Sequence, residues 1–260
     1  MYIKLNANIE GKWLSSFNSA GKRVFQNQKE TVRKKLDSFI NVKGQIEVSA
    51  LEEEWFPQVN ADVFISHSHL DEEKAMSLAG WFYEVLGVES FIDSCVWGYA
   101  NDLLKELDKR YCVRDVNNDG SYTYSYEMRN RSTAHVHMIL NTALHKMIYK
   151  TECLLFLNTP NSIIVDKVMK ETSTESPWIY SELMFAEMCR PRSIKDHRNI
   201  QHTFLEDTCL PLKYPVNLRE FDEINDDDLF KIWQKVSKRE DRKNLDELYK
   251  YLSQRNVIYG

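Results

Sequence analysis

The chain has 260 residues, of which 43% are hydrophobic, and a formal net charge of −5. This composition excludes global disorder and the strong positive field that nonspecific nucleic-acid binding requires. The five cysteines form no Cys-x-x-Cys pair, so we expect neither a disulfide framework nor a zinc site built from thiolates. No signal-peptide pattern or bilayer-spanning apolar stretch occurs, and we therefore expect a soluble, cytoplasmic protein that does not bind membranes.

Residues 1–60 predict an N-terminal helical extension, because their apolar residues recur at helical spacing. These residues are Val24, Phe25, Val32, Leu36, Phe39 and Ile40. At the other end of the chain, residues 219–260 begin with an acidic run and continue as a charged amphipathic pattern. We expect them to form a C-terminal helical appendage that packs on the core or on a partner.

Residues 61–218 alternate strand-like and helix-like segments. Strands are expected at 62–66, 88–92 and 152–157, with weaker ones at 197–204 and 214–218, and helices at 72–86, at 134–149 and from Ser176-Pro177 onward. This alternation predicts an α/β fold whose parallel sheet carries helices on both faces. Within it, residues 111–115 and 121–126 flank an Asp119-Gly120 turn and predict an inserted β-hairpin.

Ligands of open parallel sheets bind outside the carboxyl ends of the strands. In this chain that edge comprises the segments 67–71, 93–99 and 158–182, where we expect the functional site. Trp178 and Glu182 lie four residues apart and share one face of a helix, whereas Ile179 and Leu183 belong to the face that packs on the sheet. Taken alone, Glu182 is typical of a solvated helix face.

Three other motifs favour ordinary roles. Asp115-x-Asn117-x-Asp119-Gly120 begins like a calcium loop, but Tyr126 occupies the position where calcium needs a bidentate Glu. His137 and His145 share a helix face that lacks an evident third metal ligand, so we interpret it as a solvated surface and expect no metal site. Ser66-His67-Ser68-His69 lacks the elbow glycines of serine hydrolases, which favours a binding role over nucleophilic catalysis.

Taken in order, these segments resemble a Toll/interleukin-1 receptor (TIR) domain over residues 61–218. Asp62-Val-Phe-Ile-Ser-His67 is similar to its first strand, Phe91-Ile-Asp93 to its second and Glu152-Cys-Leu-Leu-Phe-Leu157 to its third. Ser176-Pro-Trp-Ile-Tyr-Ser-Glu182 looks like the helix that carries the catalytic glutamate of the NAD-cleaving members. The resemblance implies a flavodoxin-like fold, and it is greatest to bacterial antiphage-defence enzymes of the Thoeris type. The long segment 94–133 departs from the family pattern.

The resemblance implies an enzyme that cleaves NAD at the nicotinamide–ribose bond. Its products would be nicotinamide and an ADP-ribose-derived signal, cyclic in the form we favour, which a separate effector protein senses. NAD is then the substrate and no cofactor is implied, while self-assembly is left open. Glu182 would be catalytic. The residues that would contact NAD are Phe64, Ser66, His67, Ser68, His69, Asp93, Ser94, Trp97, Tyr99 and Trp178.

Two alternatives remain open. A TIR module that only scaffolds a complex would need no carboxylate at Glu182. A nucleoside 2-deoxyribosyltransferase of another flavodoxin-like family would also use a Glu at a ribosyl centre. Incubation with NAD and with nucleosides separates the three.

Overall fold

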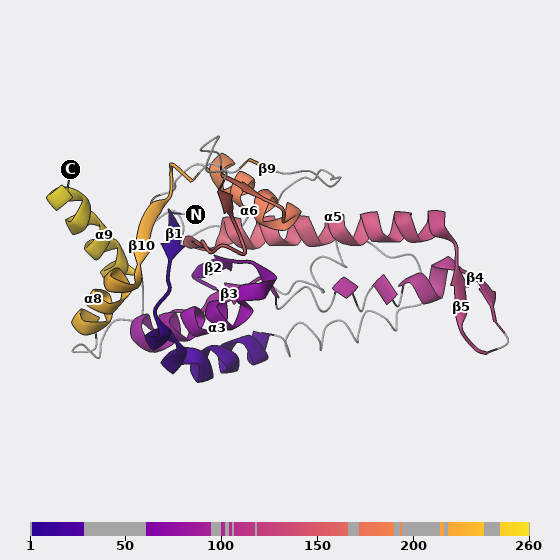
Figure 1. Cartoon of the computed structure of the whole chain (residues 1–260), viewed down its shortest axis with the longest axis horizontal. Helices are drawn as coiled ribbons and strands as arrows, with labels where there is room; N and C mark the ends of the chain where they lie inside the picture. Colours follow the sequence, from indigo (N-terminus) through magenta and orange to yellow (C-terminus); the bar gives the residue numbers. More distant parts are fainter. Residues whose placement is uncertain are drawn as a thin grey trace.

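The computed structural model describes residues 2–28, 61–94, 100–101, 104–105, 107–117, 119–165, 172–189, 193, 214–215, 218–236 and 245–259. At its centre lies a five-stranded sheet in the order β10-β1-β6-β2-β3, in which every pair is parallel (Figure 1). Its strands are β1 (Ile3–Asn8), β2 (Val63–Ser66), β3 (Ser90–Ile92), β6 (Cys153–Leu157) and β10 (Asp222–Asn225). The predicted α/β fold with a parallel sheet is confirmed.

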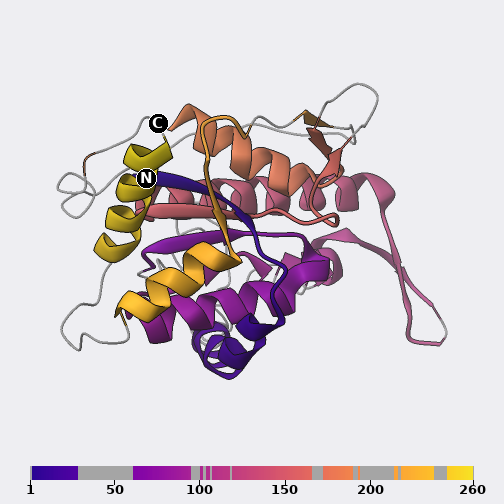
Figure 2. The same ribbon diagram turned by 60° about the vertical axis from the view of Figure 1, so that its left-hand side comes forward.

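Helices cover both faces of the sheet, as Figure 2 shows. On one face lie the N-terminal helical residues 18–28, preceded by η1 (Lys12–Phe17), and α3 (Glu72–Trp81), which η2 (His69–Asp71) precedes and η3 (Phe82–Leu86) extends. On the other face lie the second half of α5 (Tyr126–Lys150) and α6 (Pro177–Met188). The central strands β2 and β6 are buried along their whole length, which accounts for their continuous apolar sequences.

Two glycines set the distance between the N-terminal helix and α3. A Cβ atom on Gly21 would overlap the carbonyl oxygen of Met76, and one on Gly80 would overlap that of Phe17. Neither position has room for a side chain, so the two helix backbones pack in direct contact. The first segment of the chain is thereby fixed to the helix that follows β2.

The two outer segments are not purely helical, which corrects the prediction from their sequences. β1 comes from the N-terminal segment and lies between β6 and β10, and β10 comes from the C-terminal segment. The order β3-β2-β6 matches the first three positions of a flavodoxin-like sheet, and β1 occupies the next position. All three predicted segments, 1–60, 61–218 and 219–260, therefore contribute strands to one sheet.

Helices α8 (Asp226–Val236) and α9 (Asp246–Tyr259) follow β10 and pack beside this end of the sheet. The Asp226 carboxylate accepts hydrogen bonds from the backbone N–H groups of Glu10 and Gly11 and from Trp13 Nε1. These bonds connect the loop after β1 to the start of α8. They join two parts of the chain that are more than 200 residues apart in sequence.

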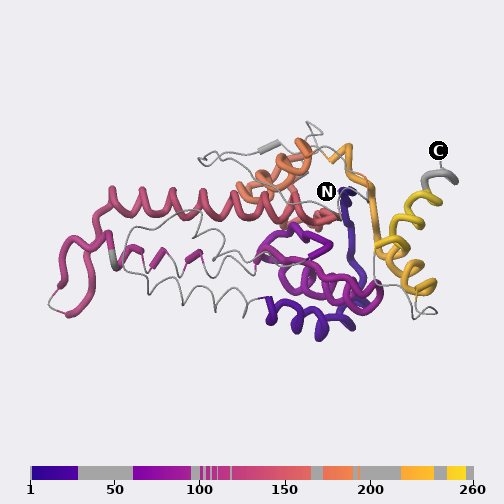
Figure 3. Tube along the Cα trace, turned by 180° about the vertical axis from the view of Figure 1, so that it is seen from behind, coloured from indigo at the N-terminus to yellow at the C-terminus, as the bar shows by residue number. Residues whose placement is uncertain are grey.

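The predicted hairpin is present as β4 (Val113–Val116) and β5 (Tyr122–Tyr124), and its turn residue Gly120 has a φ of 79°. Asp119 accepts from the backbone N–H and the hydroxyl of Ser121 within that turn, so the calcium-like motif stabilises a turn. α5 is longer than predicted and begins next to the hairpin, where Ser125 caps it. Figure 3 shows the hairpin and the first half of α5 extending away from the sheet.

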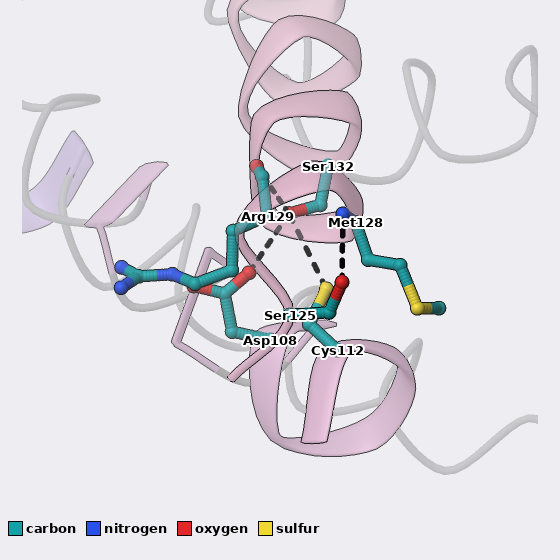
Figure 4. Close-up of polar contacts among 6 residues, drawn as sticks. All are labelled: Asp108, Cys112, Ser125, Met128, Arg129 and Ser132. Carbon is teal, nitrogen blue, oxygen red and sulfur yellow. Dashed lines mark hydrogen bonds and ion pairs between the residues drawn. The ribbon is translucent and has the colours of Figure 1, made fainter. Parts of the chain in front are cut away.

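Four side chains where the hairpin joins the start of α5 form a polar cluster that we call the clasp: Asp108, Cys112, Arg129 and Ser132 (Figure 4). Asp108 lies at the start of η4 (Asp108–Cys112) and accepts from Arg129 Nε and from Ser132 Oγ, both at 2.8 Å. The Cys112 thiol lies 3.8 Å from Ser132 Oγ. Burial raises the pKa of this thiol, which disfavours the reactive thiolate form.

A second small sheet joins β7 (Ile164–Val165), β8 (Thr172–Thr174) and β9 (Tyr214–Pro215) in antiparallel pairs near α6. β9 falls within the weaker strand expected at 214–218, whereas the one expected at 197–204 lies outside the described residues. In the part of the chain that the structure describes, we find no helix with the length and apolar character needed to cross a membrane.

Candidate functional site at the carboxyl ends of β2 and β3

Four polar side chains are buried together beyond the ends of β2 and β3: Ser66, His67, Asp93 and Glu182. We call this group the strand-end cluster. None of the four is more than 4% exposed. Ser66 is the last residue of β2, His67 follows it, Asp93 follows β3, and Glu182 comes from α6. The cluster therefore lies at the edge where parallel sheets bind ligands, as predicted.

Hydrogen bonds and the strand register fix the geometry of the cluster. Ser66 Oγ donates to Glu182 Oε2 at 2.5 Å, and His67 Nδ1 lies 2.8 Å from Asp93 Oδ1. Ile65 pairs with Ile92, so the next residue of each strand places Ser66 beside Asp93 on the same face of the sheet. That face carries α6, which brings in Glu182.

The position of Glu182 on α6 differs from the prediction. Ser176 caps the helix by accepting from the N–H of Ile179, and Pro177 is its first residue, both as expected. Glu182, however, is 1% exposed and shares the buried face with Ile179 and Leu183. Glu182 lies three residues after Ile179 and directly before Leu183. The helix face that packs on the sheet is therefore wide enough to include Glu182.

Trp178 and His137 form a contact between the neighbouring helices α6 and α5. Trp178 is half-buried, and its ring meets the His137 ring edge-on, with 5.5 Å between centroids and 82° between planes. The contact joins α6 to α5 one helical turn before Glu182. Trp178 is thus a partly exposed aromatic residue on the helix that carries the buried acid.

Burial and neighbouring charge determine the protonation states in the cluster. Desolvation raises the pKa of Glu182 well above its ordinary value, the negative charge of Asp93 raises it further, and the Ser66 hydrogen bond opposes them. For His67, burial lowers the pKa, but the charge and hydrogen bond of Asp93 outweigh it and the net pKa is raised. These directions favour a protonated Glu182 and a positively charged His67.

Among the residues that the structure describes, Glu182 Oε1 and His67 Nε2 are buried with no polar partner, and Asp93 Oδ1 has the ion pair with His67 but no hydrogen bond. A buried polar atom left unpaired costs about 1–3 kcal/mol. Such atoms are rare in folded proteins and call for a specific explanation. Two of them in one cluster at a ligand-binding edge indicate groups that are completed by a ligand.

The remaining predicted binding residues lie in different environments. Phe64 is fully buried and contacts Phe91 at 5.5 Å between ring centroids, so it belongs to the hydrophobic core. Ser94 is partly buried next to Asp93, and its hydroxyl oxygen is also unpaired within the described segments. Ser68 is half-buried, and His69 is exposed, 3.8 Å from Glu72. Trp97 and Tyr99 lie outside the described residues.

Asp71, which was not among the predicted site residues, connects two loops at this edge. Its carboxylate accepts from Thr159 Oγ1 at 2.5 Å and from Asn161 Nδ2 at 3.1 Å. The loop after β2, which contains His67, is thereby attached to the loop after β6. The three residues lie in the segments that follow the adjacent parallel strands β2 and β6, and this placement is the signal that could have suggested their contact.

Comparisons with known proteins returned no matching family model, no curated protein and no solved structure. The TIR resemblance therefore stays a prediction, and the function has to be inferred from the chemistry of the strand-end cluster. The raised pKa of Glu182 is the most informative feature of that chemistry. A positive charge placed beside a buried carboxyl group with a raised pKa, such as Glu182, favours the ionised form of that group.

Proposed function

We propose that the strand-end cluster binds NAD and cleaves its nicotinamide–ribose bond, with Glu182 as the catalytic carboxylate. The observation that carries this proposal is the buried and unpaired Oε1 of Glu182, held beside Ser66 at the ligand-binding edge of the sheet. A module that only assembles a complex gives no reason to bury an acid in this way, because the unpaired oxygen destabilises the fold.

The chemistry of NAD suits a site of this kind. The nicotinamide ring carries a positive charge, so when the bond between its nitrogen and C1′ of the ribose breaks, both electrons go to nitrogen and the base leaves neutral. No general acid is needed. The ribosyl fragment becomes an oxocarbenium ion, which a nearby carboxylate stabilises. Water or another hydroxyl or amino group then forms the new bond to C1′ and releases a proton to solvent.

Ligand charge also resolves the protonation of Glu182. The pKa of Glu182 is raised because its ionised form is desolvated and lies near Asp93. A bound pyridinium ring supplies the compensating positive charge, so the carboxyl proton is released on binding and the carboxylate is present for the reaction. Ser66 keeps its oxygen 2.5 Å from Glu182 Oε2 and orients the carboxylate, which leaves Oε1 for the ribose.

The biological part of the proposal rests on the resemblance to TIR enzymes of the Thoeris type. The product would be an ADP-ribose-derived signal, cyclic in the form we favour, made in the cytoplasm during antiphage defence. A separate effector protein would sense it. This part supposes neither a resident cofactor nor a nucleic-acid or membrane partner.

The test is nicotinamide release from NAD by the purified chain, followed by chromatography with mass detection. Changing Glu182→Gln keeps the size of the side chain and removes the charge, and it should lower the rate at least ~100-fold. Glu187→Gln, on the same helix, is the matched control and should keep the wild-type rate. Equal rates for wild type and Glu182→Gln would contradict the assignment, and absence of nicotinamide release by the wild type at millimolar NAD would contradict the function.

A further inference from the structure

We propose that Asn6, in the N-terminal strand β1, is a second ligand-binding group of the same site and accepts a hydrogen bond from a hydroxyl or amino group of the ligand. The identity of the ligand as NAD rests on the proposed function. The role of Asn6 itself rests on three observations: its row in the sheet, the orientation of its amide and its unpaired oxygen.

The strand register places Asn6 on the face of the sheet that carries Glu182. Asn6 pairs with Phe156 of β6, and Phe156 pairs with Ser66 of β2. Residues paired across neighbouring strands point to the same face, so Asn6 and Ser66 flank Phe156 in one row under α6. Two strand spacings separate them, about 9–10 Å. A dinucleotide can span this distance, whereas a single ribose ring cannot.

The hydrogen bond to Glu223 fixes which amide atom of Asn6 is free. Asn6 Nδ2 donates to Glu223 Oε1 at 2.7 Å. A carboxylate only accepts hydrogen bonds, so the nitrogen must face Glu223 and the other amide atom must be the oxygen. The free group is therefore an acceptor, and it requires a donor from the ligand.

The amide oxygen of Asn6 is in the same condition as the free oxygen of Glu182. Asn6 is 4% exposed, and its Oδ1 is buried without a hydrogen-bond partner in the described part of the chain. The two unpaired oxygens, Asn6 Oδ1 and Glu182 Oε1, thus lie on the same face of the sheet, the face that α6 covers. NAD carries donors at suitable separations from the reacting ribose: the carboxamide, the ribose hydroxyls and the adenine amino group.

The first experiment measures stability and needs no ligand. Asn6→Leu removes the unpaired acceptor at nearly constant volume, and the exposed Glu223 can turn to water, so the urea midpoint should stay the same or rise. Asn8→Leu is the matched control, because exposed Asn8 donates to the other oxygen of Glu223 at 3.0 Å. A midpoint that falls clearly below that of Asn8→Leu would show a structural role and overturn the inference.

The second experiment measures NAD cleavage by the wild type and both variants. Asn6→Leu should raise KM for NAD about tenfold or more with a smaller change in kcat, while Asn8→Leu leaves both constants unchanged. Repeating the assay with nicotinamide mononucleotide locates the donor. A penalty that persists puts the donor on the nicotinamide half, and one that disappears puts it on the adenosine half.

The two proposals fail separately in these experiments. If the wild type cleaves NAD and Asn6→Leu has an unchanged KM, the inference is overturned and the proposed function stands. If the wild type neither binds nor cleaves NAD, the proposed function fails, and the stability experiment still decides whether the Asn6 acceptor is structural.

Discussion

The clasp and the strand-end cluster each hold a buried carboxylate, but the two groups differ in how fully their polar atoms are paired. In the clasp, Asp108 accepts from Arg129 Nε and Ser132 Oγ at 2.8 Å. In the strand-end cluster, one oxygen of Glu182 and one ring nitrogen of His67 are buried without partners among the described residues. A paired network stabilises the fold, whereas an unpaired one lowers its stability.

The difference in pairing distinguishes a polar group that stabilises the fold from one that serves a function, and it does so without reference to a protein family. The clasp holds the extended half of α5 against η4, and both carboxylate oxygens of Asp108 accept hydrogen bonds. The strand-end cluster is held in place by a hydrogen bond, an ion pair and the packing of α6, yet some of its buried polar atoms have no partner among the described residues. We expect substitutions in the two regions to change stability in opposite directions.

Breaking the clasp should have the largest effect on stability. Arg129→Leu leaves Asp108, which is 5% exposed, with Ser132 as its one remaining side-chain partner among the described residues. Removing one partner of a fully buried ion pair costs about 3–5 kcal/mol. Because the Arg129 side chain is 54% exposed, we expect a smaller loss, about 2 kcal/mol, in the free energy of unfolding measured with urea.

Arg131→Leu is the control for this change. Arg131 lies on the same exposed part of α5 and pairs with Glu127 at 2.7 Å, and both side chains are more than 70% exposed. An exposed pair of this kind contributes about 0.5 kcal/mol or less. Equal losses for the two arginine variants would mean that the clasp does not stabilise the extended half of α5.

Glu182→Gln should change stability in the opposite direction. The pKa of Glu182 is raised in the folded chain, so between its ordinary pKa of 4.5 and the higher folded value the folded state binds more protons than the unfolded state. Wild-type stability therefore falls as the pH rises through this interval. The Gln variant does not titrate, and its stability relative to wild type should increase from pH 4.5 to pH 8 in urea unfolding. A relative stability that does not change with pH would contradict the buried, unpaired acid.

The sequence predicted the centre of this molecule better than its margins, for a physical reason. The apolar run at 153–157 and the Ser176-Pro177 helix start are local signals, and both were confirmed. β1 was missed because it carries the polar residues Lys4 and Asn6. These side chains are buried with hydrogen bonds to Glu220 and Glu223, respectively. Those partners lie more than 200 residues away, and local patterns contain no information about them.

The candidate site shows the same limit. Ser66 and Asp93 follow neighbouring parallel strands, so their proximity could be predicted from the strands alone. The burial of Glu182 could not, because helical spacing gives the separation between faces but not the width of the face that packs on the sheet. Asn6 could not be found before β1 was known to lie beside β6.

A third prediction tests whether pairing, rather than location, distinguishes the two regions. Asp71 lies at the same edge as the strand-end cluster, but Thr159 and Asn161 satisfy it. Thr159→Val removes one donor to a buried carboxylate and should cost about 1–2 kcal/mol of unfolding free energy. Thr123→Val, in the exposed hairpin, is the control and should change stability by less than about 0.5 kcal/mol. A neutral effect of Thr159→Val would mean that location at this edge matters more than pairing.

The smallest effect is expected at His145, where the helix of the clasp meets the helix of Glu182. The His145 ring stacks on Phe185 at 4.3 Å between centroids, and its Nε2 lies 2.9 Å from Ser181 Oγ. Ser181 uses its proton on Asn141, so His145 Nε2 must carry a hydrogen and donate it. The neutral tautomer with Nε2–H therefore completes the network between α5 and α6.

Burial lowers the pKa of His145 to about 4, against a weaker opposing hydrogen bond at Ser181. Between pH 6.5 and pH 4 the unfolded chain binds a proton here that the folded chain does not, so wild-type stability falls as the pH is lowered through this window. At pH 5 the loss is on the order of 1 kcal/mol after allowance for partial exposure. His145→Gln removes this titration, and the difference in urea midpoint between pH 7.5 and pH 5 should shrink. The exposed His69→Gln should keep the wild-type difference, and a His145 variant that also keeps it would show that charging this ring does not oppose the contact between the two helices.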